Sequence, residues 1–195
     1  MPYGSHIWSK IVEIKKKATL TLSGENPLWS DVNSPEKVKE VVVRGDMTLD
    51  RDVKQVAIEN INVQGDLAVL SNNSLEGVVG TMKIGGDMTF NGAAALETLP
   101  EEILVRRHVN ISDCASLKSI GQVKAGGDVT ILKCPTLEAI ADGLEVGGKL
   151  VIGECGALQR LPAGLRVRGD VYLDTRAAAL GIPVDAVIGG IVIRF

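Results

Sequence analysis

Three cysteines are the residues whose type and spacing most readily suggest chemistry. Cys114, Cys134 and Cys155 are separated by 20 and 21 residues. A thiol can attack a substrate beside a base, bind zinc with further ligands, or form a disulfide. The chain has two histidines, His6 and His108, and neither stands at a spacing typical of a zinc site or of a thiol–histidine pair. We therefore predict free thiols, no metal site, no cofactor and no catalytic residue.

A row of aspartates is the second candidate for chemistry. Five Gly-Asp dipeptides recur along the chain, and their acidic members are Asp46, Asp66, Asp87, Asp128 and Asp170. Each carboxylate could accept hydrogen bonds from amides at a chain reversal. The row could instead be an acidic stripe that binds a basic partner or a cation. Neighbouring like charges repel by about 1 kcal/mol in water, so either arrangement needs compensating contacts.

The bulk composition excludes several classes of protein. Among 195 residues, 21 are basic and 24 acidic, which leaves no basic field for a phosphate backbone. No apolar stretch approaches the length that spans a bilayer, and no Sec signal is recognisable. We predict no binding to nucleic acid or membranes. The sequence as given looks cytoplasmic, although secretion through another kind of signal would leave no trace in it.

The same residues define an internal repeat. Glycine-centred steps begin at 45, 65, 86, 107, 127, 148, 169 and 189, so successive intervals are 20 or 21 residues. A constant period of this length is typical of a stacked, quasi-one-dimensional fold. Like residues then lie above one another, and the three cysteines form a ladder of partly buried thiols that bond weakly to backbone.

Each step is followed by a triplet with apolar outer members, from Met47-Thr48-Leu49 to Ile191-Val192-Ile193. This alternation predicts a strand with one buried face, and stacked strands would form a parallel sheet. The outward row would be Thr48, Ala68, Thr89, Asn110, Thr130, Val151, Tyr172 and Val192. A coil of this length has no room for a full helix. We expect a positive-φ or tight corner at the glycine, with Arg107 requiring a different turn or strain.

One stretch carries a family resemblance. Leu150-x-Ile152-x-x-Cys155-x-x-Leu158-x-x-Leu161-Pro162 resembles the leucine-rich repeat, although its Cys-x-x-Leu spacing is one residue longer than the commonest form. The pattern is more similar to the receptor L domain, and the Leu-Pro endings resemble short bacterial leucine-rich repeats. The resemblance covers residues 41–195. It implies a mainly β, right-handed parallel β-solenoid of about eight coils, which binds partners through its sheet face.

The two ends depart from the repeat. Residues 1–40, with Trp8 and Trp29, are predicted to form an N-terminal cap and an irregular first coil, followed by the solenoid at 41–195. Isoleucine spacing predicts a helix over residues 5–16, and residues 18–22 resemble a first strand. The last strand has no polar cap after it, so we expect its apolar end to be covered by another subunit or a further domain.

The leading functional hypothesis is a protein-binding scaffold or recognition module, of the bacterial effector type or part of one. Its candidate binding residues are Asp128, Thr130, Val151, Asp170, Tyr172 and Val192. The alternative is a structural protein that self-assembles through its C-terminal coil. A polysaccharide-acting β-helix enzyme using carboxylates such as Asp128 and Asp170 is the least favoured hypothesis.

Overall fold

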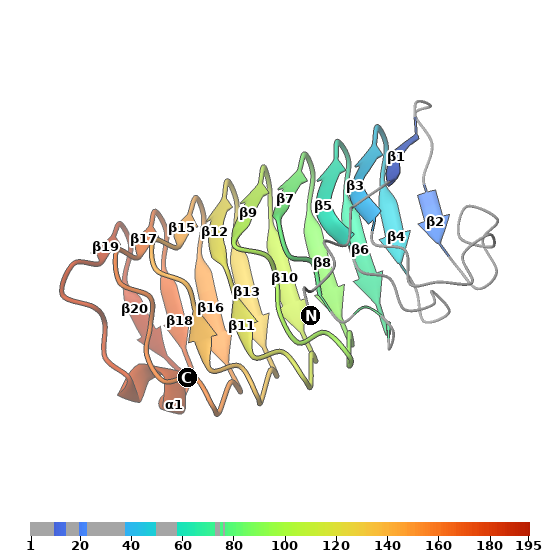
Figure 1. Cartoon of the computed structure of the whole chain (residues 1–195). Helices are drawn as coiled ribbons and strands as arrows, with labels where there is room; N and C mark the ends of the chain where they lie inside the picture. Colours follow the sequence, from blue (N-terminus) through green and yellow to red (C-terminus); the bar gives the residue numbers. More distant parts are fainter. Residues whose placement is uncertain (1–9, 15–19, 23–37, 50–57, 73–74, 76) are drawn as a thin grey trace, which may run out of the picture.

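The computed structural model describes residues 10–14, 20–22, 38–49, 58–72, 75 and 77–195. In this part the chain winds as a parallel β-solenoid with two long sheets (Figure 1). The first sheet has nine strands in the order β1, β3, β5, β7, β9, β12, β15, β17 and β19. Their bounds are Lys10–Ile14, Val38–Val43, Ile58–Val63, Thr81–Ile84, Glu102–Val105, Gln122–Ala125, Glu145–Val146, Arg166–Val167 and Val187–Ile188.

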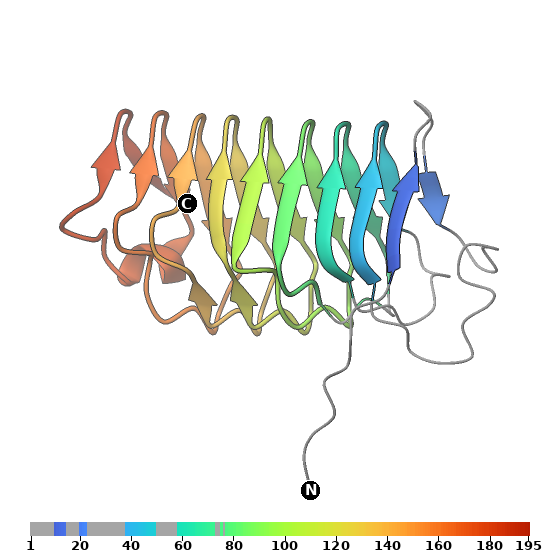
Figure 2. The same ribbon diagram turned by 45° about the horizontal axis from the view of Figure 1, so that its top comes forward.

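The second sheet contains the triplets that follow the glycine steps. Its nine strands lie in the order β2, β4, β6, β8, β10, β13, β16, β18 and β20. Their bounds are Leu20–Leu22, Met47–Leu49, Leu67–Leu70, Met88–Asn91, Val109–Ser112, Val129–Leu132, Leu150–Gly153, Val171–Leu173 and Val192–Arg194. Figure 2 shows the strands of each sheet in regular succession along the molecule. The predicted solenoid is confirmed.

A short third side closes the coils. Strands β11 (Ser119–Ile120) and β14 (Ala139–Ile140) pair in parallel, and isolated bridges join Gly77 to Thr98 and Thr98 to Ser119. The one helix in the described part, α1 (Thr175–Ala179), has five residues. The expectation that a coil of 20 or 21 residues has no room for a full helix is therefore confirmed.

The core runs along the axis between the sheets. Within β13, Val129 and Ile131 are fully buried while Thr130 between them is half-buried, and the same alternation recurs in β4, β6, β8, β16 and β18. A leucine column fills the third side, and its members Leu75, Leu96, Leu117, Leu137 and Leu158 are all buried. Burying each such side chain contributes roughly 1.5–3 kcal/mol, so the core itself enforces the repeat.

The register of the last coil differs from the sequence prediction. Val192 pairs with Val171 and Ile193 with Tyr172, so the last step is Gly190-Ile191 and the last interval is 21 residues. Val192 therefore occupies an inward position, and Ile193 occupies the outward position beside Tyr172. Two consecutive glycines, Gly189 and Gly190, allowed either to be taken as the step.

The N-terminal segment contributes strands to both sheets. The helix predicted over residues 5–16 is wrong at Lys10–Ile14, which forms β1 and pairs with β3. The isoleucines fit a helical period, whereas Val12 and Ile14 fit the alternation of a strand, and pairing with the neighbouring strand decides between the two. The strand expected at residues 18–22 is confirmed at Leu20–Leu22 by its pairing with β4. Trp8 and Trp29 lie outside the described residues.

The positive-φ corner lies after the second-sheet strand and not at the glycine step. Ser71, Asp113, Lys133 and Glu154 have φ of 48°, 56°, 54° and 54°, and Gly92 has 66° in the equivalent place. No step glycine of the described coils has a positive φ, and neither has Arg107. Of the two forms expected for the glycine step, a tight corner or a positive-φ corner, the positive-φ form is therefore wrong, and the chain bends at the step without it.

Candidate functional site

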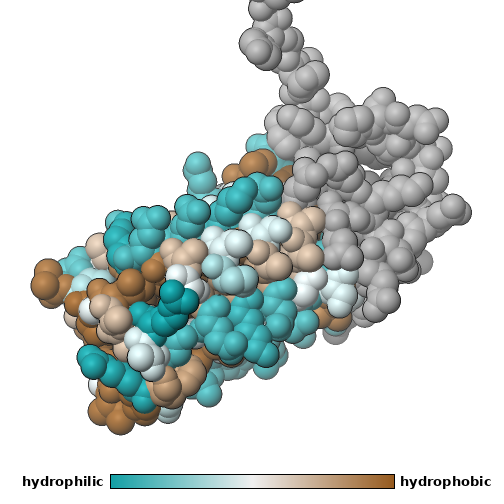
Figure 3. Space-filling view, turned by 90° about the horizontal axis from the view of Figure 1, so that it is seen from below, coloured by the Kyte–Doolittle hydropathy of each residue, from teal (hydrophilic) through white to brown (hydrophobic). Residues whose placement is uncertain are grey.

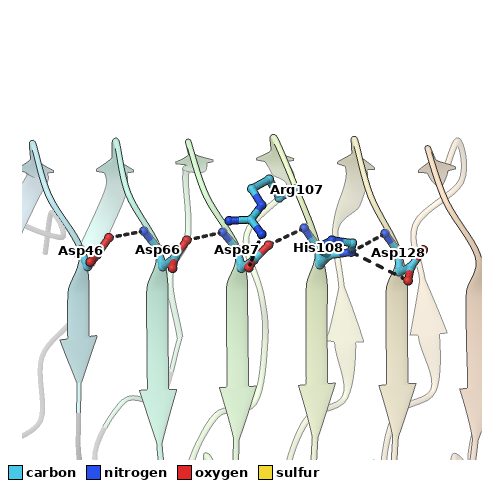
Figure 4. A network of polar contacts seen from close by, with 6 residues as sticks. All are labelled: Asp46, Asp66, Asp87, Arg107, His108 and Asp128. Atoms are coloured by element: carbon cyan, nitrogen blue, oxygen red, sulfur yellow. Dashed lines mark hydrogen bonds and ion pairs between the residues drawn. The ribbon is translucent and has the colours of Figure 1, made fainter.

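The aspartate row forms a hydrogen-bonded ladder along one corner (Figure 4). The Oδ1 atom of Asp46 accepts the backbone N–H of Asp66 at 2.8 Å, and Asp66 accepts that of Asp87 at 2.8 Å. Asp87 accepts the N–H of His108, Asp128 that of Lys149, and Asp170 that of Ile191, each at 2.9 Å. The carboxylates thus bond to corner amides, as one of our two interpretations expected. Each amide, however, belongs to the next coil.

This ladder explains the glycine at four of the described steps, where a Cβ atom would clash with the carboxylate of the previous coil: Gly65, Gly86, Gly148 and Gly190. At Gly127 a Cβ atom would meet the His108 ring, and at Gly169 it would meet backbone atoms. A Cβ atom built at Gly86 would lie 1.9 Å from the Asp66 Oδ1, and one at Gly148 would lie 2.0 Å from the Asp128 Oδ1. The carboxylate therefore occupies the space that a side chain would need. Arg107 stands at one such step, and its N–H still bonds to the Gly86 carbonyl at 3.2 Å.

Two residues other than aspartate stand in the ladder. His108 takes the acceptor role, because its Nδ1 atom accepts the N–H of Asp128 at 3.0 Å. Lys149 has no side-chain acceptor, and its Nζ atom lies 3.9 Å from the Asp128 Oδ2. Arg107 lies 3.5 Å from the Asp87 Oδ2. These cations compensate part of the repulsion between carboxylates.

The cysteines form the predicted column of free, buried thiols. The Sγ atoms of Cys114, Cys134 and Cys155 donate to the carbonyls of Ser112, Leu132 and Gly153 at 3.4, 3.4 and 3.3 Å. Each carbonyl lies two residues earlier in the chain, next to the positive-φ residue. Each of these carbonyls also accepts a backbone N–H from the preceding coil, so the thiol is its second hydrogen-bond donor.

Contacts between the thiols shift their acidities in a graded way. The hydrogen bond to Cys114 is the largest influence on Cys134, and together with burial it raises the pKa of Cys134 to about 12. The pKa of Cys155 is also raised, first by its hydrogen bond with Cys134 and then by burial. The pKa of Cys114 is lowered, because the bond from Cys134 outweighs burial. Cys114 and Cys134 are fully buried, and Cys155 is 6% exposed, so no reagent or substrate has ready access.

The outward face of the second sheet changes character along its length. Thr130, Val151, Tyr172 and Ile193 are in register on four neighbouring strands, β13, β16, β18 and β20, and each is half-buried. The earlier members of this row are Thr48, Ala68, Thr89 and Asn110. The side chains of this row are therefore small and mostly polar toward the N-terminus, and larger and apolar toward the C-terminus.

A second outward row begins with Leu70 on β6, which is 41% exposed, so this row is not uniformly polar toward the N-terminus. Asn91 and Ser112 occupy it on β8 and β10, where the Asn91 Nδ2 donates to the Ser112 Oγ at 2.9 Å. Leu132 and Gly153 follow on β13 and β16. The Phe195 ring approaches Gly153 so closely that a Cβ there would lie 3.2 Å from the ring. We call Leu132, Val151, Tyr172, Ile193 and Phe195 the C-terminal patch.

The candidate binding residues thus fall into three groups. Thr130, Val151 and Tyr172 lie side by side on the outward face. Asp128 and Asp170 lie in the corner ladder, two coils apart, with Lys149 between them. Val192 does not belong to the face. The missed members, Ile193 and Phe195, could have been found only by placing the last step at Gly190.

Two further observations concern the described residues alone. They contain no group of three or more histidine, cysteine, aspartate or glutamate side chains arranged to hold a metal ion. They also contain no helix with the length and apolar character needed to cross a membrane.

Comparison with known proteins gives no relative. No family model, no curated protein and no solved structure matches this chain.

Proposed function

We propose that this protein is a protein-interaction module that docks a partner on the outward face of its second sheet, centred on the C-terminal patch. The observation that carries the proposal is the contiguous apolar and aromatic surface on β13, β16, β18 and β20. Tyr172 lies at its centre, between Val151 and Ile193. Tyrosine is enriched among residues that dominate binding energy, because one ring supplies a large contact area and a polar tip.

The rigidity of the face favours binding. Its side chains project from strands that are hydrogen-bonded on both sides, except for those on β20. Few rotamers and no backbone segment have to be ordered when a partner docks, so little conformational entropy is lost. We expect a partner that presents apolar side chains to this face.

The resemblance to leucine-rich repeats points the same way. In that family the parallel sheet is the usual partner-binding surface, and short bacterial repeats of this kind serve as recognition domains of effectors. The Leu-x-Ile…Cys-x-x-Leu pattern and the thiol column are the features that support a comparison of this chain with such modules.

Two matched substitutions on one outward row test the proposal. Val151→Asp places a charge in the C-terminal patch, and Thr89→Asp places the same charge in the polar half of the row. We expect Val151→Asp to weaken capture of the partner at least about tenfold in a pull-down read by mass spectrometry. Thr89→Asp should retain capture, and urea unfolding should show comparable stability for both variants.

Tyr172→Ala is a second test of the docking face, and it introduces no charge. It should lower the affinity for the partner identified in the first experiment by about tenfold or more. The docking face would be refuted by a partner that binds Val151→Asp and Tyr172→Ala as tightly as the unaltered chain.

A further inference from the structure

Large apolar side chains are exposed at the C-terminal end of the solenoid. Six of the eight exposed large hydrophobic residues in the described part fall between 182 and 195: Ile182, Val184, Val187, Ile191, Val192 and Phe195. Figure 3 shows brown, apolar atoms gathered at the left end of the molecule, where the last coils lie. Contiguous apolar surface of this kind is typical of an interaction site.

The exposed apolar residues of the last coil include outward-facing positions as well as core positions that lack a following coil. In the corner row, all seven earlier described positions are Asp, His or Lys, whereas the last coil has Ile191, which is 63% exposed. In the outward column of the first sheet, Lys124, Glu145 and Arg166 are followed by Val187, which is 54% exposed. Val42 and Leu104 are the earlier apolar residues in the described part of that column, and Asn62 and Lys83 lie between them. The last coil is thus apolar on its rim as well as inside.

The last coil also has two open strand edges. Strands β19 and β20 are the final strands of their sheets in the described part. The Ile191 carbonyl accepts from Val171, and the Phe195 N–H donates to Leu173. Backbone groups alternate in direction along a strand, so those of Val192 and Arg194 point to the open edge, where another strand can pair.

We propose that a second copy of this chain covers this end, related to the first by a two-fold axis. Strand β20 then pairs antiparallel with β20 of the copy, with Ile193 opposite Ile193. Val192 of one copy lies opposite Arg194 of the other, where both present their backbone groups to the edge. A two-fold axis along the sheet normal reverses the strands of both sheets, so β19 faces its own copy as well. The rim residues Val187 and Ile191 become buried in the contact.

The corner ladder favours this arrangement over head-to-tail stacking. At six of seven described steps the corner side chain accepts an N–H from the next coil, and Ile191 has no acceptor for a coil that would follow in the same sense. In the two-fold arrangement the copy's corner lies beside the opposite end of β20, and this acceptor is not needed.

The size of the end face sets the strength of the contact. A 21-residue coil wound around two sheets about 10 Å apart has a cross-section, with side chains, on the order of 600 Å². Stable interfaces bury about 800 Å² on each partner. The contact is therefore near the lower limit for a specific dimer, and we expect dissociation in the micromolar range.

Sedimentation of the whole chain over about 1–500 μM tests the inference. The mass should rise from 20.6 kDa to twice that value and then stay constant. A chain that remains monomeric throughout would overturn the inference. A mass that grows without limit would overturn it in favour of head-to-tail assembly.

A rim variant supplies the matched control. Ile191→Asp with Val187→Arg gives the last coil the residue types of the preceding coil, where Asp170 and Arg166 occupy these positions. The fold tolerates these residues, so the melting temperature of the monomer should hold. We expect the dimer dissociation constant to rise at least about tenfold, because charges would be buried at the contact. Unchanged dimerisation would contradict the proposed interface.

Cross-linking tests the two-fold register. The native thiols are buried, so Ile193→Cys introduces the one readily oxidised thiol of the described part. Mild copper–phenanthroline oxidation should give a covalent dimer, and Tyr172→Cys, one strand further from the axis on each side, should not. A dimer of unchanged mass that Ile193→Cys does not cross-link would overturn this pairing. The two proposals share Ile193 but are tested separately, since Val151→Asp should weaken partner capture at least about tenfold and leave the dimer intact.

Discussion

At the scale of single residues, His108 shows how the corner works. Six corner side chains each supply an acceptor to the next coil, and His108 is the one among them that is not an aspartate. Its Nδ1 atom can accept the Asp128 N–H only when that nitrogen carries no proton. The corner therefore selects for an acceptor at this geometry and not for a carboxylate as such.

This interpretation predicts how substitutions at His108 behave. His108→Ala leaves the Asp128 N–H without its partner, and we expect the free energy of unfolding to fall by about 0.5–1.5 kcal/mol. His108→Asn keeps a side-chain oxygen near the same place and should lose clearly less. Urea unfolding measures both. Equal losses in the two variants would show that ring packing, and not the acceptor, accounts for the effect.

The thiol column predicts a pH dependence of stability. The pKa of Cys134 is raised from an ordinary value of 9.0 to about 12 in the folded chain. A raised folded-state pKa stabilises the fold below the unfolded pKa, and this contribution is lost as the pH rises toward the folded value. The free energy of unfolding should therefore decline between about pH 9 and pH 12, by at most about 1.4 kcal/mol per pH unit for one thiol.

Cys134→Ala is the control for this decline. Ala93 is fully buried at the equivalent place two coils earlier, so the coil accepts alanine there. The variant should be less stable at pH 7 but should lose less stability than the unaltered chain between pH 9 and pH 11. Parallel pH profiles for the two proteins would refute the assignment.

At the scale of elements, the short helix α1 depends on one side chain. The Asp174 Oδ1 accepts the Ala177 N–H at 2.7 Å at the helix start, and its Oδ2 accepts the Glu154 N–H at 2.6 Å from the previous coil. One carboxylate thus both caps the helix and attaches it to the stack.

Asp174→Ala should remove both bonds and lower stability by about 1–2 kcal/mol. Amide hydrogen exchange at Glu154 and Ala177 should accelerate together. Asp174→Asn retains one acceptor oxygen and should restore the cap but not the second bond. If exchange in Asp174→Ala became faster at Ala177 alone, the bond to Glu154 would not contribute to protection, and the shared role of the carboxylate would be refuted.

The sequence predicts elements well where one physical pattern is repeated. Positions of the second-sheet strands followed from the glycine step and the alternation after it. Sequence reasoning failed at Lys10–Ile14, whose apolar spacing suits a helix as well as a strand. It also failed at the glycine step, because the positive φ values lie after the second-sheet strands, at Asp113, Lys133 and Glu154. At four steps the space beside the glycine is filled by a carboxylate of the previous coil, and the Gly-Asp dipeptide alone does not reveal that contact.

Prediction of the candidate site was limited by one residue of register. The row through Thr130, Val151 and Tyr172 was correct because each strand repeats the one before it. Its last member was misplaced, and with it the aromatic ring of Phe195, which approaches Gly153. Such a contact joins residues from different coils and depends on the path of the chain.

At the scale of the whole molecule, each coil contacts mainly its two neighbours. Stability in such a stack is approximately a sum of coil and interface terms, so opening starts at the ends. Amide hydrogen exchange should be slowest in β10 and β13 and faster in β20. Protection of β20 should increase with protein concentration if the proposed dimer forms. Uniform protection along the molecule would contradict this picture.

The shared acceptor at the corner has a consequence for the length of the protein. Asp46, Asp66, Asp87 and Asp128 present the same atom at each level, so one whole unit can be excised without changing what its neighbours offer each other. Removing residues 87–107, for example, would bring Asp66 against the amide of His108. Duplication or loss of a single unit can thus change the length of the solenoid along its axis in steps of about 4.8 Å, the spacing of neighbouring strands.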